Sequence, residues 1–459
     1  MTKKFRRRLF YLLLIIFLIT GVGAVFYSRG WRLNLEKFTI EKTGAIYIQA
    51  KPKEVQLEIE NKPIKTQGGI LQKGFLIDGL IPKIYSITIK KEGYFSWQKE
   101  VKVEPDLVTE LTQIILIPKE ISSTPIDLQK PVKDFWLLPN RKTVIRDNEG
   151  SLYYVDDYLK TNVQKLKGVD LIHWDNDGKK IITYDPQSNN FYLEDPTASQ
   201  TVLNINVLFK NIWQREINQS FSKVKIQGVI LHPYRSNNLL LNTNQGIYII
   251  DIDQLSLKNL TEEKLLGKAY AFDFSNFYFA DEEKLWVFNL ILKSQKLLAE
   301  IPLVSKIVIS NSHKYLALLQ ENGNLYLMRP FEFEKSPQKI AEGIKDFLFS
   351  PDSKKIALWD QEGDLNIYFP EKYYYGSFKK EKGALVNLTN FSDFKKVAWY
   401  SDSSHLIVQN NQTIYFLEID DRPPINKFPL ANSIKNFFYD SGLGEFLLLK
   451  DKDLSRLIL

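Results

Sequence analysis

Few side chains in this sequence belong to the types that usually perform catalysis or bind metals. The chain has no cysteine, and its four histidines are His173, His232, His313 and His405. Metal sites need two or three ligands that converge, often at short spacing, and no His-x-x-x-His or His-x-Glu pattern occurs. The absence of cysteine excludes thiolate ligands, thiol nucleophiles and disulfides. We therefore predict no metal site, no cofactor and no thiol chemistry.

Three aspartates, Asp177, Asp352 and Asp402, occupy the same place in similar short segments of the chain. One interpretation is that their carboxylates bind cations. We favour the alternative that each aspartate caps its own turn by accepting a bond from a backbone N–H. The other residues of this turn motif are Gly178, Ser350 and Pro351.

One segment, residues 370–383, combines aromatic rings with positive charges. Its candidate contact residues are Tyr373, Tyr374, Tyr375, Phe378, Lys379 and Lys380. Exposed tyrosines beside cations suit stacking on a carbohydrate or a hot spot for a protein partner. The alternative, which we favour, is an aromatic outer strand followed by a charged turn in solvent.

Motifs of common enzyme classes are also absent from the sequence. It has neither the Gly-x-Ser-x-Gly segment of serine hydrolases nor a Gly-rich phosphate-binding loop. We therefore predict that the protein is not an enzyme.

The positive charge of the chain is concentrated at its N-terminus. The sequence of 459 residues has 61 Lys and Arg against 54 Asp and Glu, which gives a net charge of +7. Five of these charges are Lys3, Lys4, Arg6, Arg7 and Arg8, so the rest of the chain is almost neutral. A nucleic-acid-binding domain needs a basic face of its own, and we therefore predict no nucleic-acid partner.

An uncharged apolar run follows the basic cluster, from residue 9 to residue 27. Such a run is long enough to cross a hydrocarbon core of about 30 Å as a helix. The positive-inside rule then places residues 1–8 in the cytoplasm and the remainder outside. We expect a single-pass signal anchor in the cytoplasmic membrane, and a cleaved signal peptide is the alternative because Gly21 to Ala24 are small.

Residues 44–118 alternate between apolar and polar side chains. Val55, Leu57 and Ile59 alternate with polar residues, and Val101 and Val103 do the same. Each run is typical of a strand with one buried face, and turn residues separate the runs. This segment therefore predicts a small β-sandwich.

The order of these pieces resembles that of a PEGA domain. The residues that carry the resemblance are Pro52, Gly93, Tyr94 and Trp97, of which the Gly-Tyr-x-x-Trp piece is the most specific. The resemblance implies a surface-associated accessory module in a bacterial envelope protein, with no catalysis. We expect Tyr94 and Trp97 to belong to the sandwich core rather than to a ligand platform.

Residues 119–459 repeat one pattern of strand, polar turn, strand and aromatic third strand. The clearest copy is Phe347–Leu358, and weaker copies bring the number to about eight, or about 42 residues each, which is typical of a four-stranded propeller blade. The motif resembles the blades of the Tol-type periplasmic propeller and of WD-like propellers, which implies a closed ring used for protein contacts. A strand at residues 124–129 is expected to complete the last blade and close the ring.

The sequence thus predicts an all-β fold. It comprises a transmembrane helix, a small PEGA-like β-sandwich and a β-propeller of eight or, alternatively, seven blades. The function that we expect is a non-enzymatic, membrane-anchored scaffold or receptor that binds an envelope protein through a propeller face. One alternative is binding of a cell-wall or surface polysaccharide, and a less favoured one is a glycan hydrolase or lyase acting in the central funnel.

Overall fold

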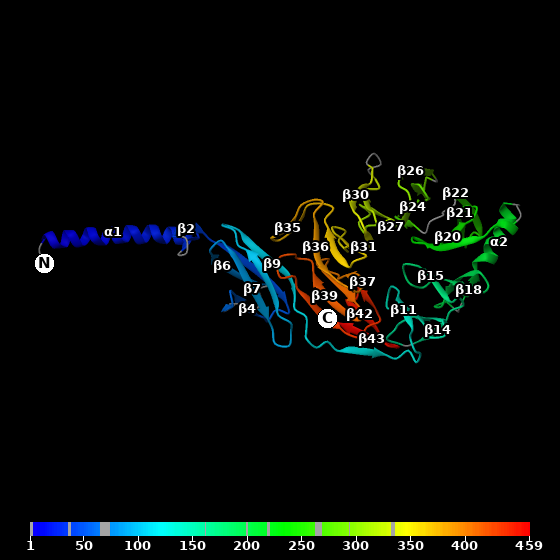
Figure 1. Ribbon diagram of the computed structural model, residues 1–459, viewed down its shortest axis with the longest axis horizontal. Helices are drawn as coiled ribbons and strands as arrows, with labels where there is room; N and C mark the ends of the chain where they lie inside the picture. The colour runs from blue at the N-terminus through cyan, green and yellow to red at the C-terminus, as the bar shows by residue number, and fades with distance from the viewer. Residues whose placement is uncertain are drawn as a thin grey trace.

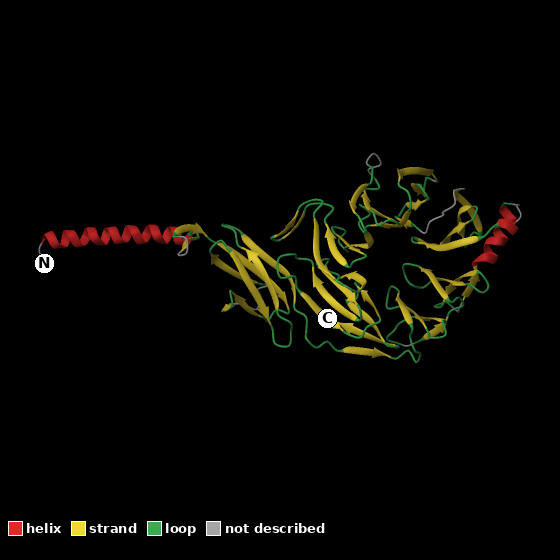
Figure 2. Ribbon diagram, viewed as in Figure 1, coloured by secondary structure: helices red, strands yellow, loops and turns green. Residues whose placement is uncertain are grey.

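The computed structural model describes residues 3–34, 38–64, 74–160, 162–198, 201–217, 221–261, 269–292, 294–331 and 336–459. Figure 1 shows a long N-terminal helix, then a small β-sandwich, then a ring of sheets. After this helix, strands are the main regular elements, and loops and turns connect them (Figure 2). The fold is therefore all-β apart from the N-terminal helix and one further helix described below.

The N-terminal helix, α1 (Lys3–Ser28), contains both the basic cluster and the apolar run. None of its side chains is buried. Among the described residues it is the one helix whose length and composition would let it cross a membrane. A short hairpin follows it, formed by β1 (Trp31–Asn34) and β2 (Thr39–Lys42).

Two sheets form the β-sandwich. One sheet has the order β6-β3-β9 and consists of β3 (Gly44–Lys51), β6 (Phe75–Leu80) and β9 (Val108–Ile115). The other has the order β5-β4-β7-β8 and consists of β4 (Gln56–Ile59), β5 (Lys62–Ile64), β7 (Ile84–Lys90) and β8 (Trp97–Lys102). Alternate residues point inward, as in β3, where Ile46 and Ile48 are fully buried. The expected sandwich is therefore present.

Residues 123–458 form eight four-stranded antiparallel sheets in the part of the chain that the structure describes. We number these sheets along the chain. The first is β11 (Asp134–Leu137), β12 (Thr143–Arg146), β13 (Leu152–Val155) and β14 (Val163–Lys165). The second is β15 (Asp170–Trp174), β16 (Ile181–Asp185), β17 (Asn190–Asp195) and β18 (Thr201–Asn204). The third is β19 (Ile226–His232), β20 (Arg235–Thr243), β21 (Gly246–Asp251) and β22 (Ser256–Thr261). The fourth is β23 (Tyr270–Phe272), β24 (Asn276–Ala280), β25 (Lys284–Asn289) and β26 (Ser294–Glu300).

The remaining four sheets follow the same plan. The fifth is β27 (Val304–Ile309), β28 (Leu316–Gln320), β29 (Leu325–Met328) and β30 (Gln338–Ala341). The sixth is β31 (Ile344–Phe349), β32 (Ile356–Asp360), β33 (Asp364–Tyr368) and β36 (Leu385–Asn390). The seventh is β37 (Phe394–Trp399), β38 (His405–Asn410), β39 (Thr413–Glu418) and β40 (Lys427–Ala431). The eighth is β41 (Asn436–Asp440), β42 (Glu445–Lys450), β43 (Asp453–Ile458) and β10 (Ser123–Ile126).

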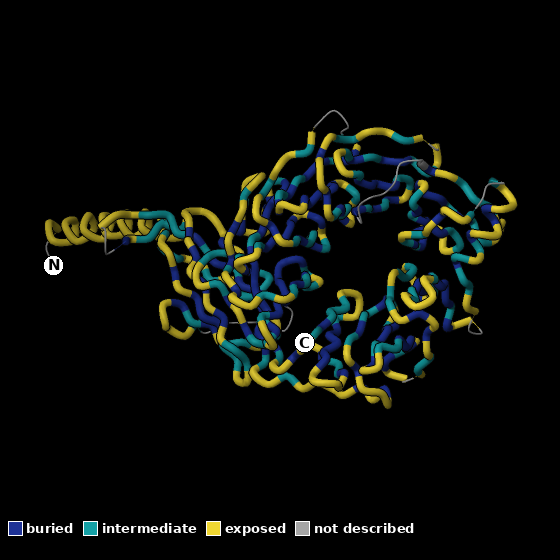
Figure 3. Tube along the Cα trace, turned by 45° about the vertical axis from the view of Figure 1, so that its right-hand side comes forward, coloured by how far each residue is buried: buried dark blue, intermediate teal, exposed yellow. Residues whose placement is uncertain are grey.

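The sheets are held together by apolar side chains between neighbours, and Figure 3 shows the buried segments around the ring. Phe347 of the sixth sheet, for example, packs with Leu319 of the fifth. A cluster of this kind joins every pair of neighbours, and Phe135 of the first sheet packs with Leu447 of the eighth. Each sheet therefore buries its two faces against other copies of the repeat.

The strand that closes the ring comes from the start of this region. β10 pairs with β43 in antiparallel register, from Ser123 opposite Leu457 to Ile126 opposite Leu454. The strand expected at residues 124–129 is therefore present over Ser123–Ile126. Its pairing leaves no free edge on β43, which is how closed sheets avoid exposed strand edges.

One helix in the ring was not predicted from the sequence. α2 (Ile205–Glu216) begins after Asn204, whose side chain accepts a bond from the N–H of Val207 at 3.1 Å. Its buried residues Phe209 and Trp213 lie four positions apart and pack between the second and third sheets. An N-cap followed by this spacing is a recognisable helix signal. A one-turn 3-10 helix, η1 (Phe221–Lys223), comes next.

The sandwich and the ring share one apolar core. Trp97 and Ile89 of the sandwich belong to the same cluster as Ile407 and Phe416 of the seventh sheet. The rings of Phe95 and Phe428 stack with their centroids 5.7 Å apart. The sandwich is therefore packed onto the ring rather than tethered to it.

Candidate functional site: the hairpin-turn face of the ring

Antiparallel strand order decides which turns lie together. In the first seven sheets the turn between the first and second strands and the connection between the third and fourth strands leave from the same end, and in the eighth sheet the first turn does so. We call the face that these turns form the hairpin-turn face. The predicted turn motif and the tyrosine-rich segment both lie on it.

Asp352 caps its own turn, as the capping interpretation expects. Its carboxylate accepts bonds from the Ser350 hydroxyl at 2.5 Å and the Lys354 N–H at 3.1 Å, and pairs with Lys355 at 2.9 Å. Burial opposes ionisation, but the ammonium of Lys355 and the hydroxyl hold the pKa of Asp352 below its ordinary value. Burial lowers the pKa of Lys355, against the attraction of Asp352.

The other two aspartates of the motif differ from each other. Asp402 accepts bonds from the N–H of Ser404 at 2.8 Å and contacts His405 Nδ1 at 2.7 Å, and these contacts outweigh burial and lower its pKa. Asp177 is exposed, and Asp175 caps that turn instead by accepting from the N–H of Lys179 at 2.8 Å. All these bonds stay within a turn, and the described residues contain no group of three or more His, Asp or Glu that could hold a metal.

The central residue of these turns has a left-handed backbone. φ is +64° at Gly178, +58° at Ser353 and +59° at Ser403. Glycine favours this region, whereas serine adopts it at a cost. The hydrogen bonds of the turn therefore determine its backbone conformation, whether the central residue is glycine or serine.

Neighbouring turns contact one another around the ring. The N–H of Asp352 donates to the Ser403 hydroxyl at 3.1 Å, which joins the sixth and seventh sheets. Between the eighth sheet and the first, Tyr158 donates to Glu445 at 2.6 Å. Further contacts join Tyr154 to Gly178, Asn176 to Pro233, Ser312 to Ser353, and Tyr439 to Ser401.

Three rings from successive turns form an aromatic stack on this face. Phe274 of the fourth sheet lies 4.7 Å from Tyr234 of the third and 4.7 Å from His313 of the fifth, measured between centroids. Phe274 is nevertheless 70% exposed and Tyr234 is 42% exposed. The stack is thus ordered by its own members while its outer surface meets solvent.

Exposed apolar side chains gather on the same face. Those in its turns are Leu159, Tyr234, Leu255, Phe274, Ile291, Leu292, Phe331, Tyr374, Tyr375 and Leu443. On the opposite face, the described connections place Val169 and Leu303 in turns and Val207 in α2. Large exposed apolar surfaces usually mark interaction sites.

The tyrosine-rich segment forms a small hairpin of β34 (Tyr373–Tyr375) and β35 (Phe378–Lys380). Tyr373 and Phe378 are buried in the core between the sixth and seventh sheets, where burial chiefly raises the pKa of Tyr373 to about 12. Tyr374, Tyr375 and Lys379 are exposed, and Lys380 pairs with Asp421 at 2.6 Å. The structure therefore does not bring the six candidate residues together on one surface.

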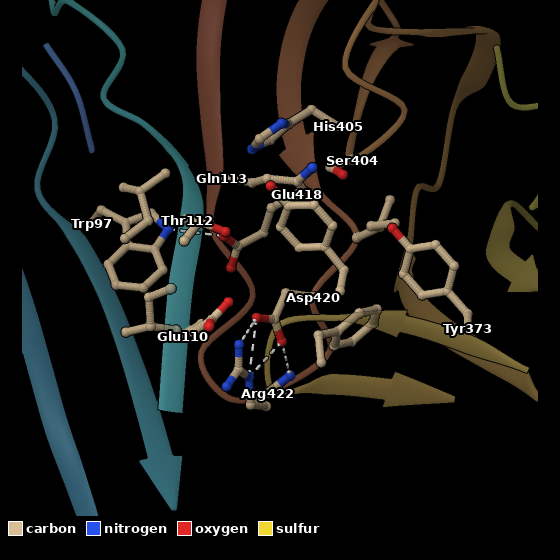
Figure 4. Close-up of a pocket in the computed structure, with 15 residues that line it drawn as sticks. Trp97, Glu110, Thr112, Gln113, Tyr373, Ser404, His405, Glu418, Asp420 and Arg422 are labelled. Carbon is tan, nitrogen blue, oxygen red and sulfur yellow. Dashed lines mark hydrogen bonds and ion pairs between the residues drawn. The ribbon is translucent and has the colours of Figure 1, made fainter. Parts of the chain in front are cut away.

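This hairpin also contacts the sandwich. The hydroxyl of Ser377 donates to the carbonyl oxygen of Glu110 at 3.0 Å. A small cavity of about 50 Å³ lies beside it, at the junction that Figure 4 shows. Trp97, Glu418, Asp420 and Arg422 line that cavity, and Trp97 donates to Glu418 at 2.8 Å. Ligand pockets usually enclose about 300–1,000 Å³, so this cavity belongs to the packing of the junction.

The remaining motif residues lie outside the face. Trp97 is in the sandwich core and Tyr94 packs against it, while Pro52 is half-buried and Gly93 is exposed in a turn. Lys3, Lys4, Arg6, Arg7 and Arg8 are exposed on the first turns of α1. Two histidines are poor bases, because burial lowers the pKa of His173 and of His232 to about 4.

Comparisons with known proteins give distant structural similarities. No family model and no curated protein matches the chain, so the resemblance to the PEGA family stays a prediction. The solved structures that resemble it include the C-terminal WD40 domain of Sif2, with a TM-score of 0.48 and 12% identity over 74% of this chain and 98% of that chain. The β-propeller domain of Myceliophteria thermophila Cps50 (Swd1) has a TM-score of 0.41 and 12% identity over 74% of this chain and 100% of that chain. BamB from Moraxella catarrhalis has a TM-score of 0.45 and 10% identity over 74% of this chain and 97% of that chain. The ring itself follows from the strand order of this chain.

Proposed function

We propose that the protein is a membrane-anchored scaffold that binds a protein partner through the hairpin-turn face and has no catalytic activity of its own. The observation that carries this proposal is the concentration of exposed apolar side chains on that face. The aromatic stack of Tyr234, Phe274 and His313 lies on the third to fifth sheets, with Ile291 and Leu292 in another turn of the fourth sheet. Ordered aromatic rings are the usual anchors of protein interfaces.

The shape of the face favours a macromolecule over a small ligand. Its turns contact one another around the ring, so the face is rigid before a partner binds. A rigid surface loses little conformational entropy on binding. The sandwich contacts the turns of the sixth and seventh sheets, whereas the aromatic stack lies on the third to fifth sheets. A partner can therefore reach the stack while the sandwich stays in place.

The anchor of this scaffold is α1. Its apolar run is long enough to span a bilayer, and the five positive charges before it favour a cytoplasmic N-terminus. The sandwich and the ring would then stand outside the cytoplasm, as expected of a bacterial envelope protein. The sandwich would act as a spacer between the membrane and the ring.

Chemical cross-linking of the full-length protein in its own membrane tests the proposal. Phe274→Asp together with Leu292→Asp places two charges on the face at exposed positions, so we expect the fold to survive and the cross-linked complex to disappear. Leu303→Asp is the matched control, because Leu303 is 54% exposed on the opposite face. Complexes that survive the double substitution unchanged would contradict the proposal.

Binding of a polysaccharide is the second candidate. Tyr374 and Tyr375 are exposed, and Tyr374 borders a groove of about 430 Å³ that Glu371 and Lys372 also line. Aromatic rings beside polar groups suit a sugar ring. A polysaccharide bound by the intact protein and lost with Tyr374→Ala would favour this candidate over a protein partner.

Topology is tested separately with single cysteines, because the chain has none of its own. We expect a membrane-impermeant thiol reagent to label Phe274→Cys on intact cells and Lys4→Cys only after the cells are opened. Labelling of Lys4→Cys on intact cells would reject the orientation.

A further inference from the structure

The hairpin of β1 and β2 exposes the apolar side chains of Leu33 and Ile40, which share one of its sides with the half-buried Trp31 and Lys42. In a strand, alternate side chains point to opposite sides, and residues paired across two strands share a side. Leu33 pairs with Ile40, and Phe38 lies in the turn directly before β2 with a φ of +52°. The exposed fraction is 55% for Leu33, 60% for Ile40 and 85% for Phe38.

On the polar side of the same hairpin, Asn34 and Arg32 are more protected than the exposed Thr39. Asn34 is only 5% exposed and donates to Glu41 at 3.2 Å. Arg32, also on that side, donates to the carbonyl oxygen of Tyr27 at 2.7 Å and lies over the Tyr27 ring at 3.5 Å. A hairpin in water would be expected to bury Leu33, Ile40 and Phe38 instead, because apolar surface is driven out of water.

The hairpin also lies beside the end of α1. Arg32 contacts Tyr27, and the ring of Trp31 lies 6.0 Å from that of Phe26. Figure 1 shows the hairpin next to the last turns of the helix. Tyr, Trp and Arg at the end of an apolar helix are typical of the boundary between lipid tails and water.

We propose that this hairpin is a second membrane contact, whose apolar face enters the interfacial layer of the bilayer outside the cytoplasm. The inference rests on the membrane span of α1 proposed above. Leu33, Phe38 and Ile40 insert among the lipid chains near the headgroups, while Arg32 and Trp31 contact the end of α1 and Lys42 pairs with the sandwich. Amphipathic helices at membrane surfaces bury their apolar side about 5–10 Å into this layer. Only Arg29 and Gly30 separate the hairpin from α1, so the span itself delivers these side chains to that layer.

The hairpin also transmits the position of the membrane to the rest of the protein. Thr43, directly after β2, donates from its N–H and its hydroxyl to the carbonyl oxygen of Gly30, both at 2.8 Å. Lys42 pairs with Asp106 of the sandwich at 2.6 Å. The bilayer would therefore set the tilt of the sandwich as well as hold the helix.

Site-specific fluorescence of the full-length protein in lipid nanodiscs tests this proposal. A single environment-sensitive fluorophore is attached at Phe38→Cys or Ile40→Cys, and lipids that carry a nitroxide near the headgroup serve as quenchers. We expect blue-shifted emission and a loss of intensity at both positions, together with protection from aqueous iodide. Either position alone can give this result, so the test remains valid if one of the two variants does not fold.

Thr39→Cys is the matched control, since Thr39 is exposed on the polar side between the two test positions. We expect its label to be quenched by iodide and to respond less to the nitroxide lipid. Equal iodide quenching at positions 38, 39 and 40 would overturn the proposal. Quenching that grows with the number of protein copies per nanodisc, without any effect of the nitroxide, would overturn it in favour of a second copy on this face.

A label at Leu18→Cys in α1 tests the membrane span separately from the hairpin contact. Its quenching by a nitroxide at the end of the lipid chains indicates that α1 spans the bilayer. A quenched Leu18→Cys label with unprotected hairpin labels would reject the hairpin contact alone. An unquenched Leu18→Cys label would reject the span on which it rests.

Discussion

Lys99 of the sandwich and Glu418 of the ring form a buried ion pair across the junction of the two parts. The ammonium of Lys99 also donates to the carbonyl oxygens of Asp420 at 3.0 Å, Arg422 at 2.9 Å and Pro424 at 3.0 Å. Glu418 accepts further bonds from Trp97 and from the N–H of Asn426 at 3.1 Å. Every polar atom of the pair is therefore satisfied without water, which fixes how the sandwich sits on the ring.

Loss of one partner of this pair should destabilise the junction strongly. We expect Lys99→Met to lower the free energy of unfolding by about 3–5 kcal/mol, because Glu418 is left buried and unpaired. The double substitution Lys99→Met with Glu418→Gln should cost less than the sum of the two single changes. Chemical denaturation of the three variants and of the unsubstituted protein measures the difference, and strict additivity would show that the pair is not coupled.

Closure of the ring by β10 and β43 predicts a large effect at Leu454. This side chain is buried with Ile126 of β10, and Leu454→Ala should lower the free energy of unfolding by about 2–5 kcal/mol. Ile458→Ala, on the same strand but 53% exposed, should change it by less than about 0.5 kcal/mol. Similar values for the two variants would mean that the closing strand is not packed as described.

Lys396 predicts a pH dependence of stability. Burial lowers its pKa to about 8, against the attraction of Asp134. The unfolded chain, with a pKa near 10.4, holds this proton more tightly, so the free energy of unfolding should rise between about pH 8 and 10.4. The full contribution is about 3 kcal/mol.

Denaturation of Lys396→Met across this pH range checks that prediction. The stability of the intact protein relative to the variant should rise with pH, since only the intact protein carries the buried ammonium. Lys395→Met is the control because Lys395 is exposed next to it. A relative stability that stays flat or falls with pH would contradict the assignment.

The tyrosine-rich hairpin should separate into structural and surface residues. Tyr373→Ala removes a buried ring and should cost about 3–5 kcal/mol, as for other large aromatic side chains in cores. Tyr374→Ala should cost less than about 0.5 kcal/mol because Tyr374 is 60% exposed. Thermal unfolding compares them, and a large loss at Tyr374 would show that it packs against the fold.

The repeat and the sandwich could be predicted because each gives a pattern among residues that are close together in the sequence. Alternating residues such as Ile46 and Ile48 give one buried face, and the turn around Asp352 recurs with its neighbours. Even the closing strand followed from the edge that β43 would otherwise expose. The helix α2 was missed although Asn204, Phe209 and Trp213 give a cap and a helical spacing.

Other features depend on contacts between distant parts of the chain. The aromatic stack joins Tyr234, Phe274 and His313 from three turns, and no pattern within one repeat indicates it. Tyr373 is buried because the hairpin inserted in the sixth sheet packs its ring into the core between the sixth and seventh sheets. The sequence did contain one signal of the junction. Lys99 lies between Trp97 and Val101 in the row of alternate residues that points inward from β8, and a lysine there requires a buried partner.

Photo-cross-linking in the native membrane tests the proposed scaffold most directly. A photoreactive amino acid is placed at Phe274 on the hairpin-turn face or at Leu303 on the opposite face, both exposed by more than half. We predict one discrete protein adduct from position 274 in intact cells and none from position 303. Equal adducts from the two positions, or none from position 274, would contradict binding through the hairpin-turn face.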